Sequence, residues 1–129
     1  AIEENYKKVS VLKKHFIEEI RMNFDDVQIN SSEEALPYII NVSFPNLKAE
    51  VLLHHLEQKN IFVSTGSACS SHKNTHSYVL KAMGVSPRYI DGAIRFSLSA
   101  ENTIKDMDDT VAALKEIIPV ISIRRRRNV

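Results

Sequence analysis

The stretch AIRFSLS, residues 93–99, decides the fold that we predict for this chain. Side chains along a strand alternate between the two faces of a sheet, so Ile94, Phe96 and Leu98 share one face. If that face packs on helices, Arg95 emerges from the opposite face among small neighbours. The pattern therefore predicts a strand with an apolar side and a guanidinium on the other side.

Three further segments are predicted to be strands. Residues 38–44 show the clearest alternation, and Pro37 can only open this strand, because an interior proline would remove a ladder donor. Residues 27–30 alternate as a short edge strand does, and an apolar run at 61–63 precedes a polar loop. The apolar face of the 38–44 strand consists of Tyr38, Ile40, Val42 and Phe44.

Helical periodicity surrounds the predicted strands. Helices are predicted at 2–22, 47–58 and 103–118, with a short helix at 77–83. Ser86-Pro87 is expected to open one more helical turn. The residues expected to face inward are Tyr6, Val9, Leu12, Phe16, Ile20, Leu47, Val51, Leu52, Leu56, Ile104, Met107, Val111, Leu114 and Ile118.

Polar residues mark the ends of these helices. Asn46 is expected to cap the second helix, and Asn60 follows it where a left-handed residue is common. Thr103 and Asp106 have the spacing of a capping box at the start of the last helix. Pro119 is expected to end that helix.

The order of these elements predicts one domain over residues 1–129, since a chain of this length holds a single modest core. The fold class is α/β (α+β): a two-layer sandwich with a small, mainly antiparallel sheet and helices on one face. Little in the chain covers the other sheet face, which presents Arg95. We expect another domain to dock there.

Composition and charge narrow the functional class. A formal charge of +1 argues against a general nucleic-acid or membrane-surface binder. Residues 124–127 are all arginine; a solvated tail is the simpler interpretation, and contact with an anionic partner is the alternative. No apolar segment is long enough to span a bilayer, and the N-terminus lacks a signal-peptide pattern. A single cysteine excludes an intrachain disulfide, and a cytoplasmic location is expected.

That cysteine, Cys69, lies in a polar loop between the 61–63 run and the 77–83 helix. Unpaired cysteines are often small core residues, so a structural role is the first alternative. The neighbouring residues continue no apolar pattern, and His72 and Lys73 would favour the thiolate. We therefore expect a reactive thiol on a mobile, accessible loop.

Arg95 also has two interpretations. It is either an ordinary exposed charge or a guanidinium held by a rigid strand, whose planar fork matches a carboxylate. His54 and His55 are adjacent on a predicted helix and point in different directions. We expect them to be surface residues, and no metal site is predicted.

Three runs together resemble the C-terminal part of NifS/IscS-like cysteine desulfurases. They are VSTGSACSS at 63–71, SYVLKAMG at 77–84 and IRFSL at 94–98. A Gly-Ser-Ala-Cys loop followed by the other two at this spacing is more specific than any one motif, and the loop is similar to that of the IscS-type branch. These are class V aminotransferase-fold enzymes that use pyridoxal phosphate, and the resemblance extends from about Pro37 into the last helix. It implies the small domain of fold-type I pyridoxal-phosphate enzymes.

The resemblance also implies roles for two residues. In that family a loop thiolate attacks the sulfur of a cofactor-bound cysteine substrate, which yields alanine and a protein persulfide. Matched by motif, Cys69 is the catalytic nucleophile and persulfide carrier, and Arg95 binds the substrate carboxylate. The chemistry requires a thiolate, because the thiolate is the nucleophilic form of cysteine.

Nothing in this chain resembles the family's Schiff-base lysine, its cofactor-phosphate ligands or its ring-stacking histidine, which lie in a preceding large domain. Lys73 and Lys81 flank the loop but lack that domain's motif. No cofactor-binding residue is therefore predicted here. Pyridoxal phosphate is expected in the full-length enzyme but not on this fragment, which we expect to be inactive alone.

The implied partners are the large pyridoxal-phosphate-binding domain, L-cysteine, and a sulfur acceptor such as an iron–sulfur scaffold or a tRNA-thiolation protein. The full-length enzyme is expected to be a homodimer, with no nucleic-acid or membrane partner. Two alternatives stay open. One is another class V enzyme such as a selenocysteine lyase, and the other is a stand-alone sulfur-relay or interaction module that binds through the open sheet face.

Overall fold

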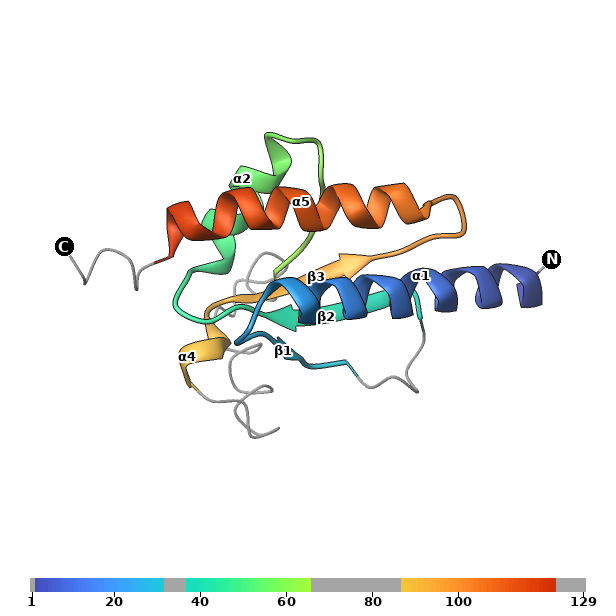
Figure 1. The fold of residues 1–129 in the computed structure, drawn as a ribbon, viewed down its shortest axis with the longest axis horizontal. Helices are drawn as coiled ribbons and strands as arrows, with labels where there is room; N and C mark the ends of the chain where they lie inside the picture. The colour runs from blue at the N-terminus through green and yellow to red at the C-terminus, as the bar shows by residue number, and fades with distance from the viewer. Residues whose placement is uncertain (1, 32–36, 66–86, 123–129) are drawn as a thin grey trace.

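A computed structural model describes residues 2–31, 37–65 and 87–122 of the chain. Three strands form one antiparallel sheet in the order β1-β2-β3 (Figure 1). The elements are α1 (Ile2–Asn23), β1 (Gln28–Ile29), β2 (Ile39–Ser43), α2 (Ala49–Glu57), α4 (Pro87–Ile90), β3 (Ala93–Ser97) and α5 (Ile104–Ile121). The predicted helix at 77–83 lies outside the described residues.

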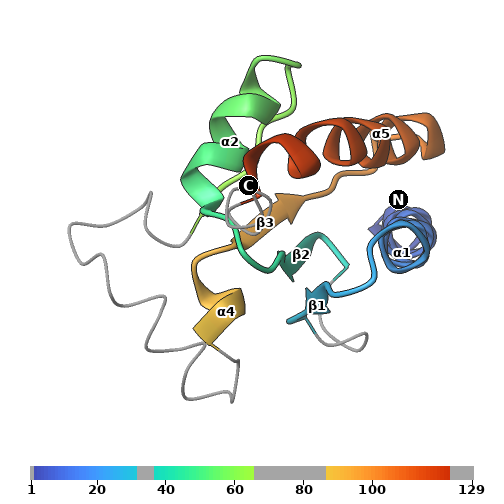
Figure 2. The same cartoon turned by 60° about the vertical axis from the view of Figure 1, so that its left-hand side comes forward.

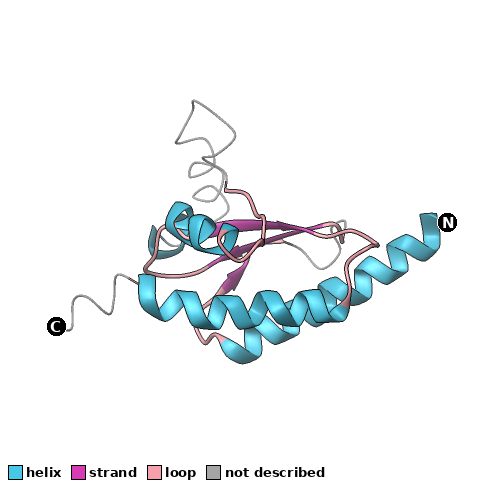
Figure 3. Ribbon diagram, turned by 90° about the horizontal axis from the view of Figure 1, so that it is seen from above, coloured by secondary structure: helices cyan, strands magenta, loops and turns pink. Residues whose placement is uncertain are grey.

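The long helices α1 and α5 lie side by side on one face of the sheet (Figures 1 and 3). One core fills the space between the layers, and α1, β2, α2, β3 and α5 all contribute buried side chains to it. At its centre the rings of Phe16 and Phe96 meet edge to face, with centroids 5.0 Å apart. The predicted two-layer fold with helices on one face is confirmed.

The predicted alternation of the two longer strands is also confirmed. Ile40 and Val42 of β2 and Ile94 and Phe96 of β3 are buried against the helices. Arg95 is exposed on the opposite face. The strands pair in one register throughout, so each residue's partner is fixed by the antiparallel ladder.

The short helix α4 lies on the other side of β3 from α5 (Figure 2). Tyr89 and Ile90 pack there against Ala93, which is buried apart from the main core. Because Ala93 and Arg95 are two positions apart on β3, they share this face. The outer face is therefore covered beside the beginning of β3 and exposed at Arg95.

The prediction of a strand at 61–63 was wrong. Ile61 and Val63 pack against the core, but Phe62 is 73% exposed and none of the three pairs with the sheet. Only Ser64 joins the ladder, in an isolated antiparallel bridge with Arg95. The apolar run was correctly expected to pack on the core in part, but its backbone does not pair with β3, which the chain meets one residue later at Ser64.

Two predicted helix ends were also wrong. Asn46 has a left-handed φ of 63° and caps nothing; α2 begins at Ala49, whose N–H donates to the Asp91 carbonyl at 2.7 Å. The Asp91 carbonyl thus satisfies an otherwise free N–H at the start of α2, as the Asn46 side chain had been expected to do. Pro119 lies inside α5, which continues to Ile121 because buried Ile117 and Ile121 anchor the last turn.

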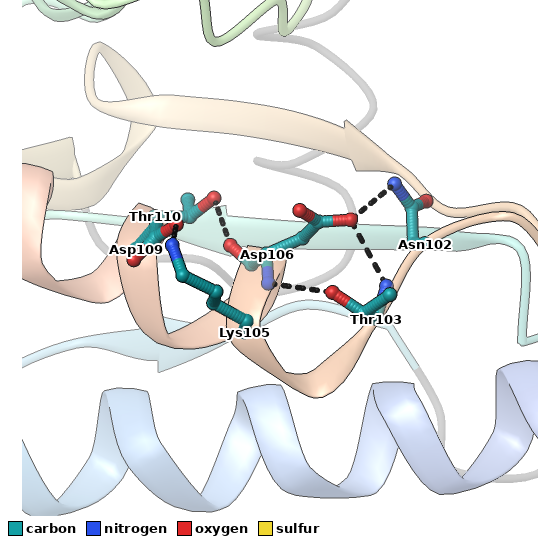
Figure 4. Close-up of polar contacts among 6 residues, drawn as sticks. All are labelled: Asn102, Thr103, Lys105, Asp106, Asp109 and Thr110. Atoms are coloured by element: carbon teal, nitrogen blue, oxygen red, sulfur yellow. Dashed lines mark hydrogen bonds and ion pairs between the residues drawn. The ribbon is translucent and has the colours of Figure 1, made fainter.

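Other predicted helix ends were right. Asn60 is left-handed, with a φ of 62°. At the start of α5, Thr103 Oγ1 accepts from the Asp106 N–H at 3.1 Å, and Asp106 Oδ2 accepts from the Thr103 N–H at 2.9 Å (Figure 4). This reciprocal pair is the predicted capping box.

The inward faces of the helices were predicted with some errors. Tyr6, Val51 and Ile104 were predicted to face inward, but their side chains are exposed. Ile17, Ala113, Ile117 and Ile121 are buried, although they were not predicted to be. None of the helices in the described ranges is both long enough and apolar enough to cross a membrane.

Candidate functional site

Arg95 lies at the middle of β3 with its side chain on the exposed sheet face. Its N–H donates to the Ser64 carbonyl at 2.8 Å, and its own carbonyl accepts from the Ser64 N–H at 3.1 Å. Both backbone groups therefore point away from β2. Opposite Arg95 on β2 is Asn41, and this pair is of the closer, non-hydrogen-bonded type.

The Arg95 side chain makes a third contact with the same residue. Its Nε–H donates to Ser64 Oγ at 3.0 Å. Within the described residues, the guanidinium has two further nitrogens, Nη1 and Nη2, that can donate to another acceptor. Residue type, strand position and orientation fit the predicted carboxylate-binding role of Arg95, which stays a prediction.

A polar network lies beside Arg95 on the same face. Asn30 Nδ2 donates to Asn41 Oδ1 at 2.7 Å and to Ser43 Oγ at 2.8 Å. The Asn41 N–H donates to Ser31 Oγ at 2.7 Å. Ser43 is fully buried, and within the described part of the chain Asn30 Oδ1 is buried without a hydrogen-bond partner. These bonds fix the strand that lies next to Arg95.

Cys69 lies outside the described residues, so the structure does not test its predicted role or its proximity to Arg95. The structure does describe the residues that flank the range 66–86, which contains Cys69. Ser64 pairs with Arg95, and Thr65 is buried. On the other side, α4 is followed directly by the turn into β3. Both described ends therefore lie at β3.

Sequence reasoning identified Arg95 but missed Ser64. A serine at the end of an apolar run carries no distinctive signal, and its pairing with a residue 31 positions later depends on the tertiary fold. The same holds for Asn41. Asn41 lies on the face opposite the apolar one predicted for residues 38–44, but its alignment with Arg95 follows from the register.

Other clusters of polar residues have simpler explanations. His15, Glu19 and Asp108 offer ligand atoms within 4.8 Å of one another, but His15 Nε2 and Asp108 Oδ1 already form a 2.7 Å hydrogen bond that links α1 to α5. His54 and His55 are on α2 without a shared target: His55 Nδ1 lies 2.9 Å from the Val51 carbonyl, and His54 lies beside Glu57.

A hollow of about 610 Å³ lies between α5, the end of β3 and residues 59–63. Phe62, Met107 and Thr110 are among its lining residues, and Arg95 is not. Ser97, two positions after Arg95 on the same face of β3, does line it, so the hollow meets that face beyond the guanidinium.

Comparison with known proteins identifies the family. The family model for class-V aminotransferases matches residues 2–109. The chain belongs to the class-V aminotransferase family. Among curated relatives, it is 36% identical over 118 residues to the cysteine desulfurase IscS of Dictyoglomus turgidum, and 33% identical over 126 residues to the mitosomal cysteine desulfurase of Encephalitozoon cuniculi.

Each of these alignments covers most of this chain and a minor part of the relative. The first covers 91% of the chain and 30% of the relative, and the second covers 92% and 29%. The solved structure of a NifS-like protein from Rickettsia africae superposes with a TM-score of 0.76 at 32% identity, covering 92% of this chain and 30% of that one. The chain thus spans about 30% of the length of these class-V proteins.

Proposed function

We propose that this chain is the small domain of a pyridoxal-phosphate-dependent cysteine desulfurase and contributes two groups to its reaction. Cys69 is the thiol that accepts sulfur, and Arg95 binds the carboxylate of L-cysteine. The observation that supports this best is the Arg95 guanidinium, fixed on an exposed sheet face in a chain whose relatives are named cysteine desulfurases.

The overall reaction balances with these two groups. L-cysteine and the Cys69 thiol give L-alanine and a Cys69 persulfide. A bond forms between the two sulfurs, the carbon–sulfur bond of the substrate breaks, and the substrate carbon gains a proton. Arg95 holds the carboxylate and so fixes the direction in which the substrate sulfur points.

The described face does not by itself fit the cofactor. Covalent attachment of pyridoxal phosphate requires a lysine, whereas the polar groups that we place on this face are one arginine and several amides and hydroxyls. We therefore assign cofactor binding to the large domain of the whole protein and expect no activity from this chain alone. The same face, with Arg95 exposed, is where that domain is proposed to dock.

The sulfur-transfer step is tested in the whole enzyme, loaded with pyridoxal phosphate and given L-cysteine. Peptide mass spectrometry without reductant is expected to find one added sulfur on the Cys69 peptide. Cys69→Ser is the matched control and gains none. An enzyme that releases alanine while Cys69 keeps its original mass would contradict the proposal, and a preference for selenocysteine would favour a selenocysteine lyase.

The carboxylate-binding step is tested with Arg95→Ala and Arg95→Lys. Loss of a bidentate, charge-assisted contact is expected to lower kcat/KM for L-cysteine by about 10- to 100-fold. Lysine keeps the charge but not the fork, so it should recover only part of the loss. Unchanged kinetics in both variants would remove Arg95 from the substrate site.

A further inference from the structure

We propose that Ser64 is a positioning residue that orients the Arg95 guanidinium for the substrate carboxylate. This inference rests on the proposed function of Arg95. It starts from the three hydrogen bonds that join these two residues, two between backbones and one from Nε to Oγ.

The backbone pair fixes where the side chain begins. Ser64 is the one described residue outside the named strands that pairs with β3, so Arg95 has a neighbour on both sides of its strand. Thr65, the residue that follows directly, is buried. Within the described residues, Arg95 is thus anchored on two sides, whereas its side chain is exposed.

The side-chain bond fixes where the guanidinium points. When an exposed arginine binds a ligand, its side chain loses conformational entropy, and this loss weakens binding. The 3.0 Å bond from Nε to Ser64 Oγ restrains the guanidinium plane before the ligand arrives. Since the group is planar, fixing Nε also directs the edge that bears Nη1 and Nη2.

This geometry predicts which kinetic constant changes. Ser64 Oγ is bonded to the guanidinium through Nε, and the proposed contact with the carboxylate uses Nη1 and Nη2. Removing Oγ loosens the arginine in free enzyme and leaves those two nitrogens available. The effect should therefore fall mainly on KM for L-cysteine and little on kcat.

The test uses the whole, cofactor-loaded enzyme with Ser64→Ala and Ser64→Thr. Alanine is expected to raise KM for L-cysteine about three- to tenfold with kcat nearly unchanged, and threonine, which keeps a hydroxyl, to restore it. Ser97→Ala is the matched control, because Ser97 is an exposed serine on the same face of β3. It should change KM less than twofold.

A second readout needs no activity. In this chain, the Nε–Hε signal of Arg95 in a nitrogen-15 NMR spectrum is expected to be protected from exchange with solvent, because Nε–H donates to Ser64 Oγ. Ser64→Ala should remove this protection and Ser64→Thr should keep it. Unchanged protection and unchanged KM in Ser64→Ala would overturn the role of Ser64. If Arg95→Ala also left KM unchanged, the proposed role of Arg95 would fail as well.

Discussion

Adding a single methyl group at Gly92 is expected to lower the stability of the fold strongly. Gly92 lies in the turn between α4 and β3, three residues before Arg95. A Cβ placed on Gly92 would lie 1.9 Å from the Phe44 carbonyl oxygen, far inside the 3.4 Å at which ordinary contact begins. The backbone here is not left-handed, so the cost of alanine comes from lack of space.

The surrounding backbone has little freedom to make that space. The Gly92 carbonyl accepts from the Phe44 N–H at 3.0 Å, and the Asp91 carbonyl accepts from the Ala49 N–H at 2.7 Å. Moving the turn away from Phe44 weakens both bonds, each worth about 1 kcal/mol. Overpacking strain adds about 1–3 kcal/mol. Gly92→Ala should therefore lower the free energy of unfolding by about 3 kcal/mol, or the Tm by roughly 10 °C.

Urea unfolding followed by far-UV circular dichroism measures this difference, with the m-value checked for each variant. Asp91→Ala is the control, because the Asp91 side chain is exposed and its carbonyl stays in place. It should change the free energy of unfolding by less than about 0.5 kcal/mol. A Gly92→Ala protein as stable as wild type would show that the turn does not hold β3 as described.

Two further predictions concern the start of α5. Thr103→Ala removes the acceptor for the Asp106 N–H and should lower the free energy of unfolding by about 1 kcal/mol, measured by urea unfolding; Thr103→Ser should restore most of it, and a fully stable alanine variant would contradict the cap. The Thr103 N–H, then Asn102, lowers the pKa of Asp106, so its stabilising effect is present at neutral pH and lost as the pH falls through the folded-state pKa. The stability difference between wild type and Asp106→Asn should therefore shrink in acid, and a constant difference from neutral pH into acid would refute this.

The parts of the fold that sequence predicts best are those governed by local periodicity. Alternation in β2 and β3 gave the correct buried faces, because one face of each strand packs on helices. The Thr103 cap was predictable for the same reason: its partner is three residues away.

The errors arose where a distant segment decides the local structure. Asn46 looked like a cap, but the Asp91 carbonyl, far along the chain, satisfies the first free N–H of α2. Pro119 looked like a stop, but buried side chains on either side of it hold the last turn of α5 against the core. Neither the Asp91 carbonyl nor the packing of the last turn can be predicted from neighbouring residues. Local rules therefore misplaced the beginning of α2 and the end of α5.

The candidate site follows the same division. The position of Arg95 on the outer face was predictable, because it is a charged residue in an alternating strand. The contact of Ser64 with Arg95 was not predictable, because it depends on the pairing of Ser64 with β3. Besides packing against the helices, β3 therefore positions Arg95 and pairs with the residue that leads into the cysteine segment. The bridge binds Arg95 at the strand's outer edge, while the Gly92 turn fixes the strand's beginning against β2 and α2. Since Ser64 leads toward Cys69 and the Gly92 turn returns the chain from it, a displacement of β3 would move the proposed carboxylate-binding group together with both described ends of the cysteine segment. We therefore expect substrate binding and sulfur transfer to be more sensitive to changes that move β3 than to equally destabilising changes in the α1–α5 contact.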